Sequence, residues 1–483
     1  MKESIPLTKS HVIYDAIYGF IKINPVEWEI IHSPFYQRLR WIKQLGFSFY
    51  VFPGAEHSRF GHSIGVMYNA HKILQSIDLA VSTKELMDPT CLTKEALYHK
   101  SLRLAALLHD LGTFCFSHTT EMAYIKYGET TNSKKGKSLQ RRLADDHENL
   151  GSYIIKNTDY RGGITHILKK YNIDPQMISD LVKGVDPSHL ANQILHSEID
   201  CDRMDYLLRD AHYTGLNYGT YDRDYLLHHF QVRNVDGHDV LSINHNAIHC
   251  VEDFLMSRFS WYSQVIRSPR GAKFDALAER LCFHFLEKGW IYRYSDLLEM
   301  VAKRPEHFYA FNDNYFMSLI HKHYCDGSLD KDPHIKDMAS CLLFEKSPEV
   351  VRSMELRQTL FNQDNTTENK KTIKKAEAKI LEIQKYLKKH GDQLDWLIPD
   401  LPTKDIIFVS SYKKVVQGKS GQNVLLERDP VKISYDNGDL KLLTHVENSV
   451  ISKLADTKNF IPNAFCSRSA YELLSRAGLI ENE

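Results

Sequence analysis

Several features that define other protein classes are missing from this sequence. Lys and Arg number 61, as do Asp and Glu, so no overall basic field exists to hold nucleic acid, and only a local patch could do so. The eight cysteines are scattered without a CxxC pair, which is typical of reduced thiols and not of a disulfide framework. No apolar run approaches the roughly 18 residues of a membrane span, and the N-terminus lacks a signal peptide's apolar core. We therefore expect a cytoplasmic protein with no membrane partner.

What the sequence does contain is a helical pattern over most of its length. A hydrophobic content of 43% is ordinary for a globular protein and allows a core large enough to exclude water from a site. Apolar residues recur at helical spacing, which predicts helices over four segments: 28–45, 59–77, 94–112 and 197–212. More helices are expected from 251 to about 345, and an alternating segment around Asp236-Gly237 predicts a hairpin over 231–250.

The last quarter of the chain has a different character. A polar stretch beginning at residue 362 leads into a Lys-rich helix with a narrow Ile and Leu stripe, which predicts packing on one side only. The segments IIFVSSYKKVV and VLLERDPVKISY predict strands, and 463–480 predicts a terminal helix. We therefore predict a mainly α fold, with a large helical domain over 1–360 and a smaller α+β region over 361–483. The polar segment 129–142 is expected to be a surface loop.

The adjacent pair His109-Asp110 directly follows the apolar segment LRLAALL. An ionised carboxylate at the end of a buried helix loses hydration and requires a partner. A divalent cation supplies that partner, since imidazole and carboxylate together suit a borderline or hard metal. Two more ligands would complete a site that leaves positions open for water and phosphate. The alternative is that the pair simply caps the helix.

Two His-Glu pairs provide candidate acid/base groups. His118 and Glu121 stand three residues apart, so in a helix the carboxylate could accept a hydrogen bond from the imidazole and raise its basicity. His147 and Glu148 are direct neighbours at the start of a predicted helix, where they would point in different directions. Each pair is also compatible with an ordinary solvated helix start.

The segment from Asp202 to Asp210 (DRMDYLLRD) places several functional side chains at helical spacing. Asp202, Tyr206 and Asp210 are spaced by four and share one helical face. Such a face could offer a metal ligand, a ring and a sugar contact together, with Arg203 as a phosphate contact. A salt-bridged amphipathic surface is the alternative.

Four blocks occur in a fixed order over about 30–270. They are FYQRLRWIKQLGFSFYVFPGAEHSRFGHSIGV, LLHDLGTFCFSH, DDHENLG and IDCDRMDYLLRDAHYTG. Together they resemble the HD-domain deoxynucleoside triphosphate triphosphohydrolases, the family that includes the vertebrate SAM-and-HD-domain enzyme and bacterial relatives. The resemblance implies an HD-domain helical phosphohydrolase core, which precedes the smaller α+β C-terminal part predicted above.

The resemblance also implies a metal centre. Its ligands would be His62, His109, Asp110 and Asp202, holding one divalent ion. The sequence does not distinguish Mn, Mg, Fe, Ni or Zn, and a second Mg²⁺ could accompany the nucleotide.

Further residues would surround the reacting phosphate. The resemblance implies that His118 backed by Glu121, and His147 backed by Glu148, are the acid/base groups. The implied substrate-binding residues are Arg59 and Arg203 for phosphates, Gln44 and Asp210 for the 3′-hydroxyl of deoxyribose, Leu45 against the 2′ position and Tyr206 against the sugar.

Some positions depart from the family pattern. The family writes HDLGHGPFSH with a third histidine where Thr113 stands here, and Thr can hydrogen-bond phosphate but cannot carry a proton at neutral pH. Arg203 stands where the family usually has Lys. Near the base pocket, Ile266, Ser268 and Pro269 replace the family's aromatic residue and His-Lys pair, so base preference is not inherited. Arg258 and Tyr262 remain as pocket-wall or phosphate contacts.

The vertebrate enzyme's allosteric nucleotide site is only partly kept. His32 occupies the position of its guanine-reading Asp, whereas Gln37 and Arg40 match. A nucleotide activator is therefore compatible with the sequence, with altered recognition chemistry. Because oligomers are usual in the family, we expect a homo-oligomer, either a dimer or a tetramer.

The function implied is hydrolysis of deoxynucleoside triphosphates to a deoxynucleoside and inorganic triphosphate. Two alternatives remain open. One is another HD phosphohydrolase, acting on nucleoside mono- or diphosphates, cyclic nucleotides or nucleic-acid ends. The other is a nucleotide sensor without turnover.

Overall fold

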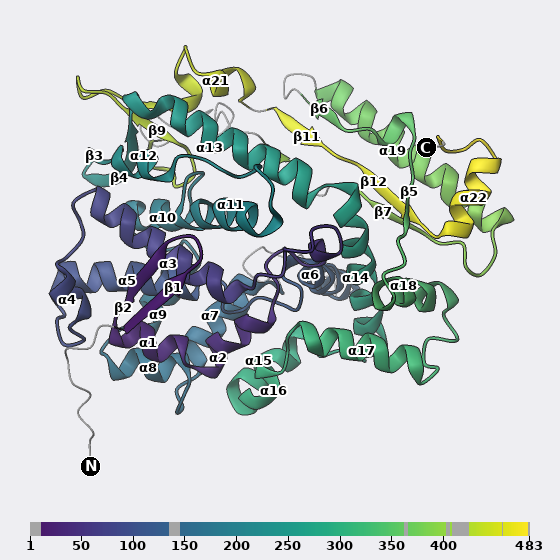
Figure 1. Cartoon of the computed structure of the whole chain (residues 1–483), viewed down its shortest axis with the longest axis horizontal. Helices are drawn as coiled ribbons and strands as arrows, with labels where there is room; N and C mark the ends of the chain where they lie inside the picture. Colours follow the sequence, from purple (N-terminus) through teal and green to yellow (C-terminus); the bar gives the residue numbers. More distant parts are fainter. Residues whose placement is uncertain are drawn as a thin grey trace.

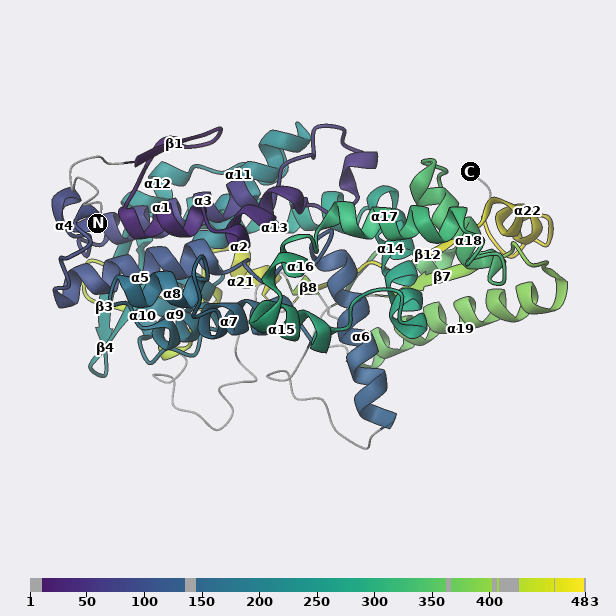
Figure 2. The same ribbon diagram turned by 90° about the horizontal axis from the view of Figure 1, so that it is seen from below.

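The computed structural model describes residues 11–134, 145–361, 366–401, 406–407, 425–455 and 457–481. Helices dominate, and the predicted mainly α fold with a smaller α+β C-terminal part is confirmed. The molecule is elongated, with the N-terminal helices towards one end and the C-terminal helix α22 (Arg468–Arg476) at the other (Figures 1 and 2).

The N-terminal part differs from the prediction of one helix over 28–45. A hairpin of β1 (His11–Asp15) and β2 (Gly19–Ile23) is followed by two short helices and two 3₁₀ turns, namely α1 (Pro25–Ile31), α2 (Pro34–Gln37), η1 (Arg38–Trp41) and η2 (Ser48–Tyr50). The single-helix prediction is wrong because Ser33 and Pro34 start a new helix. Ser33 accepts a hydrogen bond from Tyr36 N as an N-cap, and proline is tolerated only at a first turn.

Three helices that carry the candidate site form where the apolar spacing predicts them. They are α3 (Arg59–Ser76), α5 (Lys94–Leu108) and α11 (Cys201–Thr214), and α3 packs against both of the others. The third helix begins later than predicted because Asp200 is its N-cap, accepting from Arg203 N at 2.7 Å.

Other helices surround these three. They are α4 (Thr83–Met87), α6 (His118–Lys134), α7 (His147–Asn157), α8 (Ile164–Lys170), α9 (Pro175–Val182), α10 (His189–His196), α12 (Arg223–His228), α13 (Ile248–Trp261), α14 (Pro269–Lys288), α15 (Tyr294–Lys303), α16 (Pro305–Tyr309), α17 (Asp313–Cys325) and α18 (Pro333–Leu343), with short turns η4 (His245–Ala247), η5 (Tyr262–Ile266) and η6 (Met354–Leu356). The first part of the loop predicted over 129–142 is helical, because α6 continues to Lys134. Residues 135–142 lie outside the described part of the chain.

The predicted hairpin is confirmed as β3 (Phe230–Val235) and β4 (His238–Asn244). Its two-residue turn, Asp236-Gly237, has positive φ values of 51° and 83°, which glycine adopts without strain and aspartate tolerates. Strand β9 (Lys432–Ser434) pairs parallel with β4, and β10 (Leu440–Leu442) completes the sheet.

The C-terminal part holds the Lys-rich helix and two more small sheets. The helix is α19 (Thr366–His390). One sheet has the order β5 (Glu349–Val350), β12 (Asn463–Cys466), β7 (Leu397–Asp400), and the other has β6 (Thr359–Phe361), β11 (Lys458–Phe460), β8 (Ile406–Ile407); η7 (Leu443–His445) and α21 (Val450–Leu454) lie between them in sequence. The predicted terminal helix therefore begins as a strand, and most of IIFVSSYKKVV lies outside the described residues.

The division near residue 360 stays a prediction. Strands from both sides of it pair with one another, as in β4 with β9 and β5 with β12. Figure 1 shows α21 beside α13, and Ser449 and Val450 at the start of α21 donate hydrogen bonds to Glu252 in α13.

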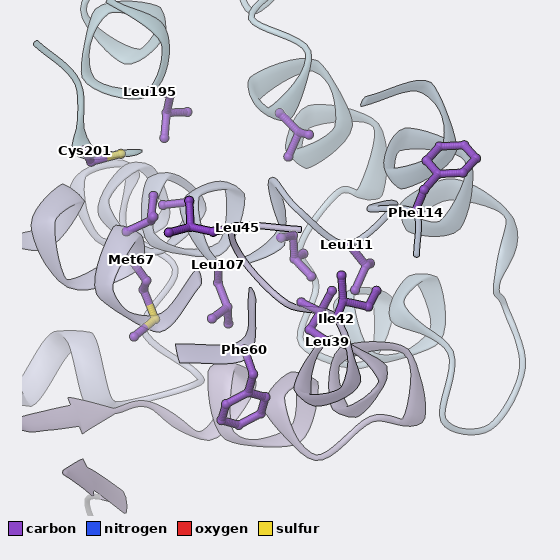
Figure 3. Packing of buried hydrophobic residues seen from close by; sticks show 14 of the residues in the cluster. Leu39, Ile42, Leu45, Phe60, Met67, Leu107, Leu111, Phe114, Leu195 and Cys201 are labelled. Atoms are coloured by element: carbon purple, nitrogen blue, oxygen red, sulfur yellow. The ribbon is translucent and has the colours of Figure 1, made fainter. Parts of the chain in front are cut away.

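The helices that carry the site pack against one another through the main hydrophobic core. Figure 3 shows side chains from 39–45, from α3 and from the end of α5 meeting in one buried cluster. Leu39, Met67 and Leu107 are completely buried, and full burial of such a side chain contributes about 1.5–3 kcal/mol. Among the helices of the described ranges, none is long and apolar enough to cross a membrane.

Candidate metal centre

Three elements bring four ionisable side chains to one point. His62 comes from the first turn of α3, His109 and Asp110 directly follow α5, and Asp202 comes from the first turn of α11. His62 Nε2 lies 3.0 Å from Asp202 Oδ1 and 3.7 Å from Asp110 Oδ2. His109 Nε2 lies 3.5 Å from Asp110 Oδ2 and 3.7 Å from Asp202 Oδ1. Two imidazole nitrogens and two carboxylate oxygens therefore converge.

This donor set fits a divalent cation. Metal–ligand bonds of about 2.0–2.2 Å place neighbouring ligand atoms about 3.0–3.6 Å apart, close to the separations found here. The Nε2 atoms of His62 and His109 are buried, and neither makes a hydrogen bond to a described residue. A cation would satisfy both nitrogens and both carboxylates, whereas a helix cap alone would leave the nitrogens unpaired.

Each histidine is oriented by a partner behind it. His62 Nδ1 donates to Asp205 Oδ2 at 2.7 Å, and His109 Nδ1 donates to Ala106 O at 2.7 Å. These bonds put the protons on Nδ1 and direct the lone pairs of Nε2 towards Asp110 and Asp202, the arrangement common to metal-binding histidines. Sequence reasoning assigned no role to Asp205, although its spacing of three from Asp202 was a signal that could have identified it.

Asp205 is itself held in a buried ion-pair network. Arg209 donates from Nε and Nη2 to the two carboxylate oxygens at 2.8 and 3.0 Å, and also pairs with Asp15 at 2.9 Å. A glycine makes room for the network, because a Cβ at Gly65 would lie 1.8 Å from Asp205 Oδ1. The close approach explains a glycine inside α3.

The centre concentrates negative charge around one imidazole. Burial lowers the pKa of His62, but the nearby carboxylates of Asp202 and Asp205 raise it to about 10. Burial raises the pKa of Asp110, but the Arg59 guanidinium and His109 hold it well below its usual range. The carboxylates are therefore ionised at neutral pH, and the site attracts a cation.

Arg59 stands beside the centre at the N-terminus of α3. Its Nη1 donates to Asp110 Oδ2 at 2.7 Å and its Nε donates to Ser117 Oγ at 2.9 Å. Ser117 adopts a positive φ of 58° and also donates to Lys43 O at 2.5 Å. The guanidinium is thus fixed next to the predicted metal ligands.

A second cluster joins α6 and α7. His118 Nδ1 donates to Glu121 Oε2 at 2.7 Å, and His147 Nδ1 donates to Glu121 Oε1 at 2.6 Å. The two rings lie 5.2 Å apart between centroids. The pairing of His118 with Glu121 occurs as predicted, but the pairing of His147 with Glu148 is wrong, because consecutive helical residues point about 100° apart. One carboxylate backs both histidines.

The charge of Glu121 favours the protonated form of His147. Burial lowers the pKa of His147, but the Glu121 carboxylate raises it to about 9. Burial raises the pKa of Glu121, but both histidines hold it well below its usual range.

Both clusters open into one cavity of about 220 Å³. Its lining includes seven of the predicted residues: Arg59, His109, Asp110, His118, His147, Glu148 and Asp202. Ligand pockets usually measure about 300–1,000 Å³, so this cavity suits the reacting end of a ligand and not a whole nucleotide.

Other predicted substrate contacts are engaged within the protein and do not line this cavity. Arg203 Nη1 donates to Asp200 Oδ2 and to Ser197 O, and the Thr113 hydroxyl donates to Asp110 O at 2.7 Å. Tyr206 packs on Trp261 with ring centroids 4.8 Å apart, an aromatic contact that sequence reasoning missed.

The remaining predicted residues lie around the same helices. Arg258 in α13 donates to Glu198 O at 3.2 Å, and Tyr262 begins the π-helical turn η5. Leu45 is in the core and is 7% exposed. Gln44 and Asp210 are buried, and Asp210 accepts a hydrogen bond from His57.

In the predicted activator region, Arg40 Nε donates to Gln37 Oε1, and His32 Nδ1 donates to Trp28 O.

Comparison with known proteins identifies the domain that contains both clusters. Residues 59–210 match the family model of the HD domain. YwfO of Bacillus subtilis, an uncharacterized protein, is 29% identical over 314 residues, which are 63% of this chain and 61% of YwfO. The deoxynucleoside triphosphate triphosphohydrolase SAMHD1 of Homo sapiens is 25% identical over 366 residues, 68% of this chain and 53% of SAMHD1. The matches thus span about half to six tenths of these curated relatives.

A solved structure shares the fold over nearly the whole chain. A phosphohydrolase from Bacteroides thetaiotaomicron superposes with a TM-score of 0.64, covering 95% of this chain and all of the other at 19% identity. At that identity the likeness concerns the fold alone.

Proposed function

We propose, from the HD domain that this chain contains, that the protein is a metal-dependent phosphohydrolase that splits deoxynucleoside triphosphates into a deoxynucleoside and inorganic triphosphate. HD domains hold divalent metals, and homologues of the chain include SAMHD1 proteins, which are named deoxynucleoside triphosphate triphosphohydrolases. His62, His109, Asp110 and Asp202 would be the ligands.

A single observation carries the proposal. The convergent His and Asp cluster and the His118–Glu121–His147 cluster open into the same cavity, with Arg59 in its wall. A metal site, groups able to carry protons and a cation for phosphate are what hydrolysis of a phosphate ester requires.

The reaction can be written on these residues. Water oxygen bonds to the α-phosphorus, the bond from that phosphorus to O5′ breaks, and O5′ receives a proton. When bound, a divalent ion here would polarise the phosphorus–oxygen bonds and acidify water. Arg59 would neutralise charge developing on phosphoryl oxygens, and proton donation by His118 or His147 would contribute about 10²–10⁴ in rate. The shared Glu121 carboxylate keeps both imidazoles oriented.

Sugar recognition would use the residues near α11. Gln44 and Asp210 would bind the 3′-hydroxyl, Tyr206 would contact the ring, and Leu45 would crowd a 2′-hydroxyl. Arg203 would bind phosphate after exchanging its contact with Asp200, while Thr113, Arg258 and Tyr262 would complete the substrate surroundings. Ribonucleotides are therefore expected to be poorer substrates, and equal turnover of ATP and dATP would contradict this role of Leu45.

Product analysis tests the proposal most directly. The purified protein is incubated with each dNTP and either Mn²⁺ or Mg²⁺, and the products are identified by mass. Deoxynucleoside with inorganic triphosphate is the expected result. Release of orthophosphate or a nucleoside monophosphate would replace the proposed reaction with that of another phosphohydrolase, and nucleotide binding without any product would indicate a sensor.

Two further expectations concern assembly. We propose a homo-oligomer, a dimer or tetramer, which light scattering coupled to size-exclusion chromatography would measure. Activation by a nucleotide at the Gln37 and Arg40 region would appear as a lag or sigmoidal rate curve that added nucleotide removes.

A further inference from the structure

A buried histidine outside both clusters is hydrogen-bonded to Asp210, near the C-terminal end of α11. His57 Nε2 donates to Asp210 Oδ1 at 2.8 Å, and their side chains are 3% and 0% exposed. The His57 ring is stacked on Tyr213, with centroids 4.6 Å apart and planes 9° apart. The imidazole is therefore fixed in position from two directions.

The loop that carries His57 is pressed against the end of α11. A Cβ at Gly54 would lie 2.3 Å from Tyr213 O, so no larger residue fits this approach. Gln44 N donates to His57 O at 3.0 Å, which ties the neighbouring chain segment to the same loop. Gln44, His57 and Asp210 consequently form one rigid unit.

This unit has buried polar atoms whose partners are missing from the described part of the chain. They are Gln44 Oε1, Asp210 Oδ2 and His57 Nδ1. An amide oxygen and an ionised carboxylate can only accept hydrogen bonds. Burial raises the pKa of Asp210, and the hydrogen bond from His57 opposes that rise, so His57 favours the accepting form. A complementary ligand group must therefore donate, as a hydroxyl does.

The unit is placed well for the sugar of an extended ligand. Asp210 follows Asp202 by eight residues on one helix, which separates their backbones by about 12 Å along the α11 axis. The metal centre and the hydroxyl acceptors thus lie at two ends of one helical face, consistent with phosphate at one end and sugar at the other.

We propose that His57 is a positioning residue that holds the Asp210 carboxylate so that it and Gln44 accept a hydrogen bond from the 3′-hydroxyl of the substrate. This inference rests on the proposed function, because a deoxynucleoside 5′-triphosphate has a single free sugar hydroxyl, on C3′. His57 itself does not touch the substrate. It acts through Asp210.

Two variants separate the hydrogen bond from the packing. His57→Phe keeps a ring for Tyr213 but removes the N–H donor. His57→Gln removes the ring but keeps a donor at nearly the same place as Nε2. His212→Phe is the matched control, because His212 also contacts Tyr213 but is exposed. The readouts are kcat and KM for dATP and for 2′,3′-dideoxy-ATP, with the melting temperature of each variant.

The wild-type protein should prefer dATP to dideoxy-ATP. In His57→Phe, kcat/KM for dATP should fall about tenfold to a hundredfold, the scale of a hydrogen bond to a charged group, and the preference should shrink towards one. His57→Gln should retain most of the preference, and His212→Phe all of it. Activity on dideoxy-ATP should change little in any variant.

The opposite ranking, with His57→Phe retaining the preference and His57→Gln losing it, would assign His57 a packing role and overturn the proposal. If His57→Phe does not fold, a folded His57→Gln that loses the preference for dATP over dideoxy-ATP also overturns the proposal. Wild-type protein that hydrolyses both nucleotides equally overturns the positioning role and leaves the proposed function intact. Wild-type protein that hydrolyses neither nucleotide contradicts both the positioning role and the proposed function.

Discussion

The candidate metal centre and the His118–Glu121–His147 cluster face one cavity, but their histidines are supported differently. His62 and His109 each have a separate partner, the Asp205 carboxylate and the Ala106 carbonyl. His118 and His147 share the two oxygens of Glu121. Because their partners are separate, a substitution that misorients one of His62 and His109 leaves the other in place. Because His118 and His147 share one carboxylate, a single substitution of Glu121 should misorient both.

Substitution of a predicted metal ligand should have the largest effect on activity. His62→Ala or Asp110→Ala should abolish hydrolysis and lower bound metal, because each removes an atom at the point of convergence. Metal content is measured by elemental analysis and activity by product release. His166→Ala, at a side chain 48% exposed, is the control and should change neither. Full activity in either site variant would remove that residue from the metal site.

The shared carboxylate should have the next largest effect. Glu121→Gln should lower kcat by about 10²–10⁴, because both histidines lose their charged acceptor, while bound metal stays unchanged. Glu148→Gln, in the same cavity wall, is the matched control and should cost much less. A larger loss in the Glu148 variant would restore the sequence-based pairing of His147 with Glu148.

Separate support at the metal centre predicts a graded loss. Asp205→Asn should weaken metal binding about 10–100-fold, since the amide orients His62 without the negative charge. Titration of the metal-free protein with Mn²⁺ measures this affinity, and saturating metal should recover activity. An unchanged affinity for Mn²⁺ would show that the hydrogen bond from His62 to Asp205 does not influence metal binding.

Two glycines of α3 test the packing around Asp205. Gly65→Ala should destabilise the fold by about 1–3 kcal/mol, because its Cβ would overlap the Asp205 carboxylate. Gly61→Ala, whose Cβ would lie 3.5 Å from Arg209 Nη1, should stabilise the helix by about 0.5–1 kcal/mol. Urea unfolding measures the free energy of unfolding of both variants. Equal changes in the two variants would show that the Asp205–Arg209 network shifts to accommodate the added methyl group.

Much of the scaffold could be predicted from local pattern. Apolar spacing located α3, α5 and α11, because a helix that buries one face repeats that face every three to four residues. The break at Ser33 and Pro34 was missed, although a capping serine before proline is a local signal. The four-stranded sheet could not be predicted, because β4 and β9 lie far apart in sequence and pairing across such a separation has no local signature.

For the site, the sequence by itself supplied the predicted chemical types, through its resemblance to a known family: two histidines and two aspartates for a cation, two more histidines for protons, and an arginine for phosphate. The tertiary structure alone decided which group supports which. It assigned Glu121 and not Glu148 to His147, placed Asp205 behind His62, and joined His57 to Asp210. The reason is physical. Side-chain chemistry is carried by each residue, but hydrogen-bond partners depend on distances and directions that only packed helices define.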